Sequence, residues 1–247
     1  MSTKTVLENT GLPYLSWRDF LWEFKWGLDE HVLIIGHTGA GKTTICRELA
    51  LMRKNVAIFV CKIKDPLFNH MAAVDDFIIV PRWPNKIDPD AHGKRHIILW
   101  PPGAGKLAAN DLIKVRFKVA MDRLLATGNW VIVIDELLYF SGPKWLGLSD
   151  RIELHLMHGR GQRQPLVLAT ARAANVPLLA YDQISHLFAF AENDKRNAET
   201  EGDIVGYDRL MVRNIVMNLD EHDAFYTNTR TKFMCITRAP APPTAGQ

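Results

Sequence analysis

Short apolar runs recur along the chain and predict buried β-strands. The clearest span residues 31–35, 55–61 and 130–134, and they are apolar on both faces, as central strands of a parallel sheet are. Weaker runs of the same kind lie at residues 77–80, 96–100, 166–169, 186–191 and 233–237.

Helical periodicity separates several of these runs. Residues 43–52 carry apolar residues at helical spacing. Residues 110–126 form the best pattern, with Lys114, Lys118 and Asp122 opposite an expected inward stripe of Leu112, Val115, Val119, Leu124 and Leu125. Strand and helix alternation predicts an α/β fold with a mostly parallel central sheet and helices on both of its faces.

The ends differ in composition from this pattern. We expect a flexible leader at residues 1–12, a single domain at 13–238 and a disordered Pro/Ala-rich tail at 239–247. Next to the leader, Trp17, Phe20 and Phe24 share helical spacing, and Phe24 and Trp26 alternate as a short strand does. This aromatic cluster packs over the sheet or offers a ring to a nucleotide base, and the pattern does not separate the two.

Composition limits the classes of function. The chain has 247 residues, 47% of them hydrophobic, and a net charge of +3, so any nucleic-acid contact has to come from local patches. Its three cysteines are far apart, which is typical of reduced intracellular thiols. No apolar stretch approaches the length of a membrane span, so we expect a soluble protein, cytoplasmic in a host cell or associated with a virion.

The strand at 31–35 runs directly into a phosphate-binding motif. Gly36, Gly41, Lys42 and Thr43 match the pattern G-x-x-x-x-G-K-[ST], and a predicted helix follows. Backbone amides curl around phosphates in such a loop, Lys42 reaches the outer phosphates, and the Thr43 hydroxyl helps to hold Mg²⁺. The predicted nucleotide-binding residues are Gly36, His37, Thr38, Gly39, Ala40, Gly41, Lys42, Thr43 and Thr44.

Two carboxylates follow the strand at 130–134. Asp135 is the expected partner of Mg²⁺, partly through water, and Glu136 is the expected residue that orients and polarises water for attack on the γ-phosphate. Thr170 ends the next predicted strand, and its hydroxyl is a candidate sensor of the γ-phosphate if the two strands are neighbours. Together with Lys42, Glu136 and Thr170 are candidate catalytic residues.

A basic, glycine-flanked turn precedes Thr170. Arg160 is the first candidate for an arginine finger that acts on the nucleotide of a neighbouring subunit, and Arg163 is the second. A solvated basic turn is the alternative interpretation of both residues.

Three segments, read in order, resemble one known superfamily. G-H-T-G-A-G-K-T-T, V-I-V-I-D-E and G-R-G-Q-R-Q-P-L-V-L-A-T-A-R are similar to the motifs of FtsK/HerA ATPases, and most similar to those of small viral and phage genome-packaging ATPases. The resemblance implies a RecA-like P-loop core, ATP and Mg²⁺ as cofactors, and double-stranded DNA as a partner. It also implies a homo-oligomeric ring, most often a hexamer, that docks on a portal or viral membrane protein without inserting into the membrane itself.

The resemblance has one visible departure and adds two DNA-contact candidates. Members of the superfamily usually carry glutamine where this chain has Ala171, and a methyl group cannot hydrogen-bond a phosphate. Lys144, in the loop after the acidic pair, and Arg163 are the candidates for phosphate contacts in a DNA channel. The run of Lys114, Arg116 and Lys118 is a weaker candidate, for which a solvated helix face is the favoured interpretation.

Three other functions remain open from sequence. A conjugative or plasmid DNA-transfer ATPase shares all of these motifs. A small-molecule phosphotransferase or a nucleotide switch that does not translocate shares the phosphate loop alone.

Overall fold

A computed structural model describes residues 2–242, and a single sheet of ten strands crosses it. The strand order is β1-β10-β9-β8-β2-β7-β6-β3-β5-β4. The strands are β1 (Tyr14–Leu15), β2 (His31–Ile35), β3 (Asn55–Phe59), β4 (Ile78–Val80), β5 (Arg95–Leu99), β6 (Val131–Ile134), β7 (Leu166–Thr170), β8 (Ile184–Phe190), β9 (Asp223–Asn228) and β10 (Met234–Arg238).

Parallel pairing dominates, as the sequence predicts. All strands from β8 through β2, β7, β6, β3 and β5 to β4 are parallel neighbours, whereas β9 pairs antiparallel with both β8 and β10. Strand β7 lies between β2 and β6, so the segment after β7 falls between the phosphate loop and the acidic pair. The fold class is the predicted one.

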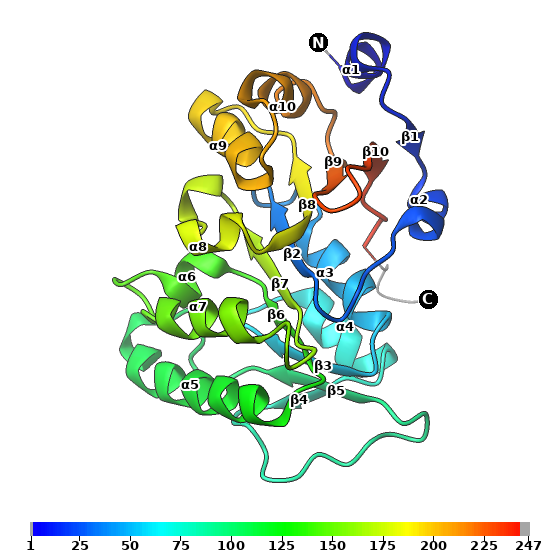
Figure 1. The fold of residues 1–247 in the computed structure, drawn as a ribbon. Coiled ribbons are helices and arrows are strands. Elements are labelled where there is room, and N and C mark those ends of the chain that lie inside the picture. Colours follow the sequence, from blue (N-terminus) through cyan, green and yellow to red (C-terminus); the bar gives the residue numbers. More distant parts are fainter. Residues whose placement is uncertain (1, 243–247) are drawn as a thin grey trace.

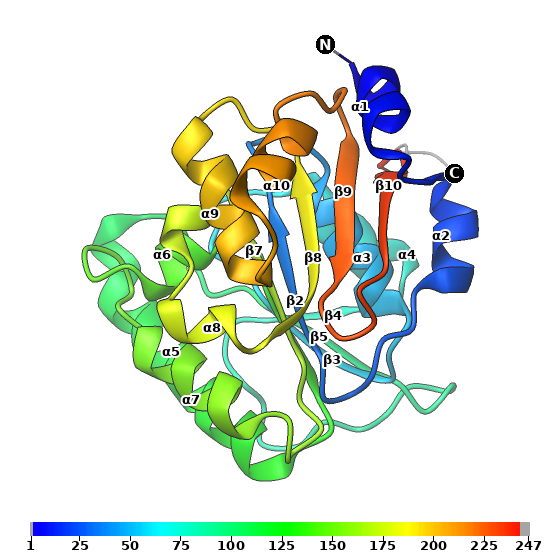
Figure 2. The same cartoon turned by 45° about the horizontal axis from the view of Figure 1, so that its top comes forward.

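Helices cover both faces of the sheet (Figure 1). The view turned by 45° in Figure 2 shows α2 and α3 on one side of the sheet and α9 and α10 on the other. The helices are α1 (Thr3–Thr10), α2 (Trp17–Glu23), α3 (Lys42–Leu51), α4 (Pro66–Val74), α5 (Asn110–Thr127), α6 (Leu137–Ser141), α7 (Ser149–His158), α8 (Leu178–Tyr181), α9 (Lys195–Val205) and α10 (Arg209–Val216), with short 3₁₀ turns at Leu107–Ala109 and Ala173–Asn175.

Strand β2 shows how the two layers form. Its side chains alternate between the faces, so Leu33 and Ile35 enter the core under α5, α7 and α9, whereas Val32 and Ile34 enter the core under α2, α3 and α4. All five residues of the strand are buried. The phosphate loop therefore starts from a rigid support.

The buried face of α5 differs from the predicted one. Ile113, Phe117 and Met121 face the core, together with Ala120 and Leu124. Three members of the predicted stripe lie outside, since Leu112, Val115 and Val119 are 49%, 59% and 42% exposed, whereas Leu124 is buried as predicted. The prediction was wrong because the helix has two apolar stripes, and the one with phenylalanine has more apolar area to bury against Phe59 and Phe140.

The aromatic cluster packs over the sheet. Phe20 and Phe24 are buried and contact Phe188 of β8 and Tyr226 of β9. These rings are enclosed and cannot stack on a nucleotide base, so packing is the correct alternative. Residues 24–26 form no strand and instead leave α2 toward β2.

The segment expected as a flexible leader contains helix α1. Thr3 Oγ1 donates a hydrogen bond to Asp223 Oδ2 over 2.9 Å, and Asp220 N donates to Thr3 Oγ1 over 2.7 Å. Val6 is buried beside these contacts. The helix docks through residues far away in the sequence, which is why local pattern gave no sign of it.

The C-terminal segment reaches the phosphate loop. Residues 239–242 belong to no helix or strand, and residues 243–247 of the predicted disordered tail lie outside the described residues. Ala239 is buried, and its N–H donates to the carbonyl of His222 over 2.9 Å. A Cβ on Gly41 of the phosphate loop would lie 2.8 Å from the Cβ of Ala239.

Among the helices described, none is long and apolar enough to cross a membrane.

Candidate nucleotide-binding site

The loop between β2 and α3 has the conformation of a phosphate cradle. Gly39 and Gly41 have φ angles of 89° and 114°, which other residues rarely adopt. Gly36 is required for a different reason, because a Cβ there would lie 2.7 Å from the Cβ of Phe190. Gly41 is the N-cap of α3, so the unpaired amides and the positive dipole end of that helix face the loop.

Lys42 is held at this loop. Its Nζ donates to the carbonyls of Gly36 and His37 over 2.6 and 2.9 Å. Burial is the main influence on the side chain and lowers the pKa of Lys42, although nearby Glu136 opposes the shift. The Lys42 ammonium therefore lies within the loop, where it can contact a phosphate that the loop binds.

The acidic pair lies at the same edge of the sheet. Asp135 follows β6 and is buried, with its Oδ1 accepting a hydrogen bond from the Cys61 amide over 3.1 Å. Glu136 is the N-cap of α6, and no side-chain hydrogen bond of its carboxylate is found among the described residues. Burial, and then the charge of Asp135, raise the pKa of Glu136.

One cation joins the two groups expected to hold a metal. Lys62, three residues after β3, places its Nζ 3.2 Å from Thr43 Oγ1 and 3.3 Å from Asp135 Oδ2. The same Nζ lies 3.0 Å from Asp65 Oδ2. Burial alone lowers the pKa of Lys62, but the carboxylates of Asp135 and Asp65 more than offset this and raise it above its ordinary value.

These side chains surround one cavity of about 380 Å³. Its lining combines loop residues and the charged side chains of Asp135, Glu136 and Lys62 with less polar residues of α4 and of the C-terminal segment. The residues that line it are Thr38, Gly39, Gly41, Lys42, Thr43, Thr44, Lys62, Asp65, Pro66, Leu67, His70, Asp135, Glu136 and Pro242.

Thr170 has the expected position but not a free hydroxyl. Strand β7 is the neighbour of β6, which meets the condition set for a sensor. However, Thr170 is buried, and its Oγ1 contacts the backbone of Arg172 and the side chain of Asn175. A sensor role for Thr170 stays a prediction that requires the turn after β7 to rearrange. Ala171, in the same turn, is half-buried.

Arg160 and Arg163 lie at the opposite edge of the sheet from Lys42. Both precede β7, whereas the phosphate loop follows the parallel strand β2. Arg160 Nη2 donates to the carbonyl of Gln183 over 3.0 Å, and its buried Nε has no hydrogen-bond partner within residues 2–242. Arg163 is exposed. Neither arginine can therefore reach the phosphates bound by its own chain.

Lys144 lies in the exposed loop after α6. Trp145 is 41% exposed and packs on Tyr139, with 5.3 Å between ring centroids, so the aromatic residue steadies the loop. Because α6 starts directly after Glu136, this loop belongs to the edge that carries the cavity.

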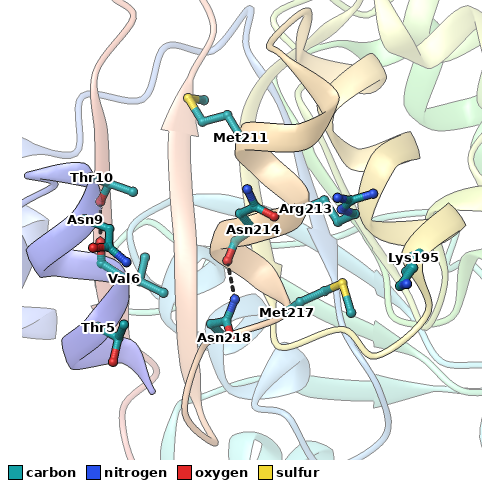
Figure 3. A pocket seen from close by; sticks show the side chains of 10 residues that line it. All are labelled: Thr5, Val6, Asn9, Thr10, Lys195, Met211, Arg213, Asn214, Met217 and Asn218. Carbon is teal, nitrogen blue, oxygen red and sulfur yellow. Dashed lines mark hydrogen bonds between the residues drawn. The ribbon is translucent and has the colours of Figure 1, made fainter. Parts of the chain in front are cut away.

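A second cavity, of about 630 Å³, lies between α1 and α10 (Figure 3). It shares no lining residue with the first cavity, and none of its described lining residues carries a carboxylate. We assign it no role in phosphate chemistry. Its lining consists of Thr5, Val6, Asn9, Thr10, Lys195, Met211, Arg213, Asn214, Met217 and Asn218.

The sequence did not single out Lys62, Asp65, His70 or Pro242 as site residues. A signal existed for the first two, because charged residues that closely follow a buried parallel strand belong to the edge where α/β sheets bind ligands. His70 and Pro242 carry no such mark. They reach the cavity through α4 and through the path of the chain after β10.

No protein-family model matches the sequence, and no curated protein gives a significant match. Solved structures do match. The DNA-packaging ATPase B204 from Sulfolobus turreted icosahedral virus has a TM-score of 0.61 and 15% identity over 86% of this chain and 98% of its own. The genome packaging NTPase B204 of Sulfolobus turreted icosahedral virus 2, in complex with AMPPCP, has a TM-score of 0.55 and 14% identity over 87% and 100%.

The conjugation coupling protein TcpA of pCW3, with ATPγS, has a TM-score of 0.51 and 11% identity over 85% of this chain and 60% of its own. At such identities the likeness establishes the fold and not the substrate. The chain has the RecA-like P-loop NTPase fold, and the resemblance drawn from its motifs is confirmed at that level.

Proposed function

We propose that this protein hydrolyses ATP to move double-stranded DNA, as a genome-packaging motor of a virus or phage. One observation carries the proposal: the phosphate loop, Asp135 and Glu136 line a single cavity at the carboxyl edge of the sheet. A carboxylate beside the metal ligand can orient and polarise water for attack on the γ-phosphate, and a nucleotide kinase that transfers to a hydroxyl group does not require one in this place. The likeness to packaging and DNA-transfer ATPases supports the choice of DNA.

The residues present fit Mg²⁺. A hydroxyl oxygen and a carboxylate oxygen are donors that this ion prefers. Buried Asp135 Oδ2 has no partner in hydrogen-bonding geometry within the described chain, and the Lys62 ammonium, 3.3 Å away, is its charged neighbour. Thr43 and Asp135 would hold the ion, the latter partly through water. Bound there, Mg²⁺ supplies positive charge against the β- and γ-phosphates.

Each side chain then has a definite task. The amides of residues 36–44 and the N-terminus of α3 bind phosphate oxygens, and Lys42 exchanges its two carbonyl partners for phosphate. Glu136 accepts a proton from the attacking water. Its raised pKa makes it a better base than an exposed glutamate, since burial destabilises the charged form.

We place the nucleobase against the less polar residues of the cavity lining. Pro66, Leu67 and His70 of α4 belong to this lining, and so does Pro242 of the C-terminal segment. Apolar surfaces of this kind accept a purine ring without reading its edge. ATP is the nucleotide we propose, by likeness to relatives that were solved with ATP analogues.

We infer a ring of identical subunits, with six as the expected number. Arg160 of one subunit would complete the site of the next, since the two lie on opposite edges of each copy. The ring would dock on a portal or viral membrane protein, in a host cell or a virion.

The test is ATP hydrolysis measured with and without double-stranded DNA, beside the mass of the assembly. We expect DNA to stimulate turnover and the mass to correspond to a multiple of the subunit. A monomer that ignores DNA and needs a small acceptor would instead be a phosphotransferase. A protein that binds ATP and turns it over slowly under both conditions would be a nucleotide switch.

Lys144→Ala tests the proposed DNA contact. The lysine is exposed and does not line the nucleotide cavity, so basal hydrolysis should stay unchanged. DNA stimulation should fall several-fold, and the salt dependence of DNA binding should become weaker, because each lost phosphate contact reduces the slope by about one.

Lys118→Ala is the matched control for Lys144→Ala. Lys118 is an exposed lysine on α5, on the face that we expect to be solvated. Equal loss of basal and stimulated hydrolysis in Lys144→Ala, or an equal loss of stimulation in both variants, would contradict a channel role for Lys144.

A further inference from the structure

Lys62 lies between groups that belong to three different segments. Its Nζ is within 3.3 Å of Asp135 Oδ2, Thr43 Oγ1 and Asp65 Oδ2, which come from the ends of β6, the phosphate loop and the start of α4. The Lys62 carbonyl accepts a hydrogen bond from Trp100 Nε1 over 2.8 Å, so the backbone is fixed. Only the side chain is free to change partners.

Asp135 depends on this lysine. Its side chain is fully buried, its Oδ1 is bound by one amide, and its Oδ2 has the Lys62 ammonium as its charged neighbour. A buried carboxylate without a countercharge is strongly destabilising, and removing one partner of a buried pair costs far more than the net worth of the pair. Lys62 therefore stabilises the folded chain as well as the site.

Asp65 is a second carboxylate partner for the same lysine. Asp65 Oδ1 caps α4 by accepting from Leu67 N over 2.9 Å, which leaves Oδ2 for the ammonium. If Lys62 leaves Asp135, its charge is still paired. The lysine therefore keeps one carboxylate partner when Mg²⁺ replaces it as the countercharge of Asp135.

We propose that Lys62 is an internal cation that competes with Mg²⁺ for Thr43 and Asp135. It neutralises Asp135 until metal and nucleotide arrive together, and then turns to Asp65. This inference rests on the proposed function, because it takes Thr43 and Asp135 as the metal-binding groups. It assigns Lys62 a positioning role: the residue sets how much Mg²⁺ the site needs before nucleotide binds.

Lys62→Met is the direct test, since it removes the ammonium and keeps an apolar stem. Binding of a fluorescent ADP analogue is titrated with Mg²⁺. We expect the Mg²⁺ concentration for half-maximal binding to fall by about three- to tenfold, as for the loss of one competing ion pair. Without metal and nucleotide, we expect the melting temperature to fall by about 5 °C, because Asp135 loses its countercharge.

Lys64→Met is the matched control, since it removes an exposed lysine from the same loop and should change neither quantity. Lys62→Met/Asp135→Asn removes both charges and should recover most of the lost melting temperature. If Lys62→Met does not fold, this double variant still reports the coupling. If the double variant does not recover the melting temperature, Lys62 is not the countercharge that stabilises Asp135.

Two results on nucleotide binding separate the possible failures. An unchanged or increased Mg²⁺ requirement in Lys62→Met, with normal binding by the wild type, would overturn the competition and leave the proposed function standing. If the wild type binds no nucleotide in saturating Mg²⁺, the proposed function fails, and this inference fails with it.

Discussion

Glu136→Gln is expected to reduce ATP turnover by about 10²- to 10⁴-fold while nucleotide binding stays close to that of the wild type. The carboxylate lines the cavity and is free to accept a proton from water. Glutamine has nearly the same shape, but its amide cannot accept that proton. The measurement is single-turnover hydrolysis together with binding of a fluorescent ATP analogue.

Two comparisons make this result specific. Lys42→Ala should lose binding and hydrolysis together, because it removes the phosphate contact itself. Asp150→Asn changes an exposed carboxylate at the start of α7 and should leave both unchanged. If Glu136→Gln keeps DNA-stimulated turnover, Glu136 is not the base. Loss of binding together with turnover would assign the residue to nucleotide binding.

The fold and the phosphate end of the site could be predicted because their signals are local. Strands β2 and β3 are apolar after a single polar residue and β6 is apolar throughout, and the phosphate loop needs its residues in one short stretch. Asp135 and Glu136 follow from the same reasoning, because a strand that ends in carboxylates brings them to the ligand edge.

Parts that depend on distant residues escaped prediction. Strand β9 contains Asp223, Thr227 and Asn228, which look like loop residues, yet all six of its positions are buried. Asp223 is tolerated there because Thr3, Tyr14 and Arg238 supply its hydrogen bonds and charge. A sequence pattern cannot display a partner more than 200 positions away.

Lys62 shows a different limit. The sequence places it at the ligand edge, but whether a lysine there contacts phosphate, carboxylate or solvent depends on the angle between β3 and β6 and on the start of α4. Only the distances to Thr43 and Asp135 reveal that it bridges the two groups for which we propose metal binding. The positive charge of Lys62, considered alone, would have favoured the prediction of a phosphate contact.

Arg160→Ala is expected to reduce hydrolysis by about 10³-fold if the guanidinium stabilises the transition state of a neighbouring site. In its own chain Arg160 is tied to the Gln183 carbonyl at the amino edge of the sheet, so the loss cannot arise from its own phosphate loop. Nucleotide binding should change little. Arg163→Ala, in the same turn, is the matched control and should keep most of the basal hydrolysis measured without DNA.

Mixing two inactive variants distinguishes a shared site from a structural role. Arg160→Ala subunits have an intact phosphate loop, and Lys42→Ala subunits have an intact arginine. In a ring formed at random from equal amounts of the two variants, roughly a quarter of the interfaces would join an intact phosphate loop to an intact Arg160. Activity should then return to a measurable fraction of the wild-type value. If the mixture forms rings of wild-type mass but stays as inactive as Arg160→Ala and Lys42→Ala alone, Arg160 supports only its own subunit. Recovery in the mixture has no explanation within one chain, because each parent lacks a group that it cannot supply to itself.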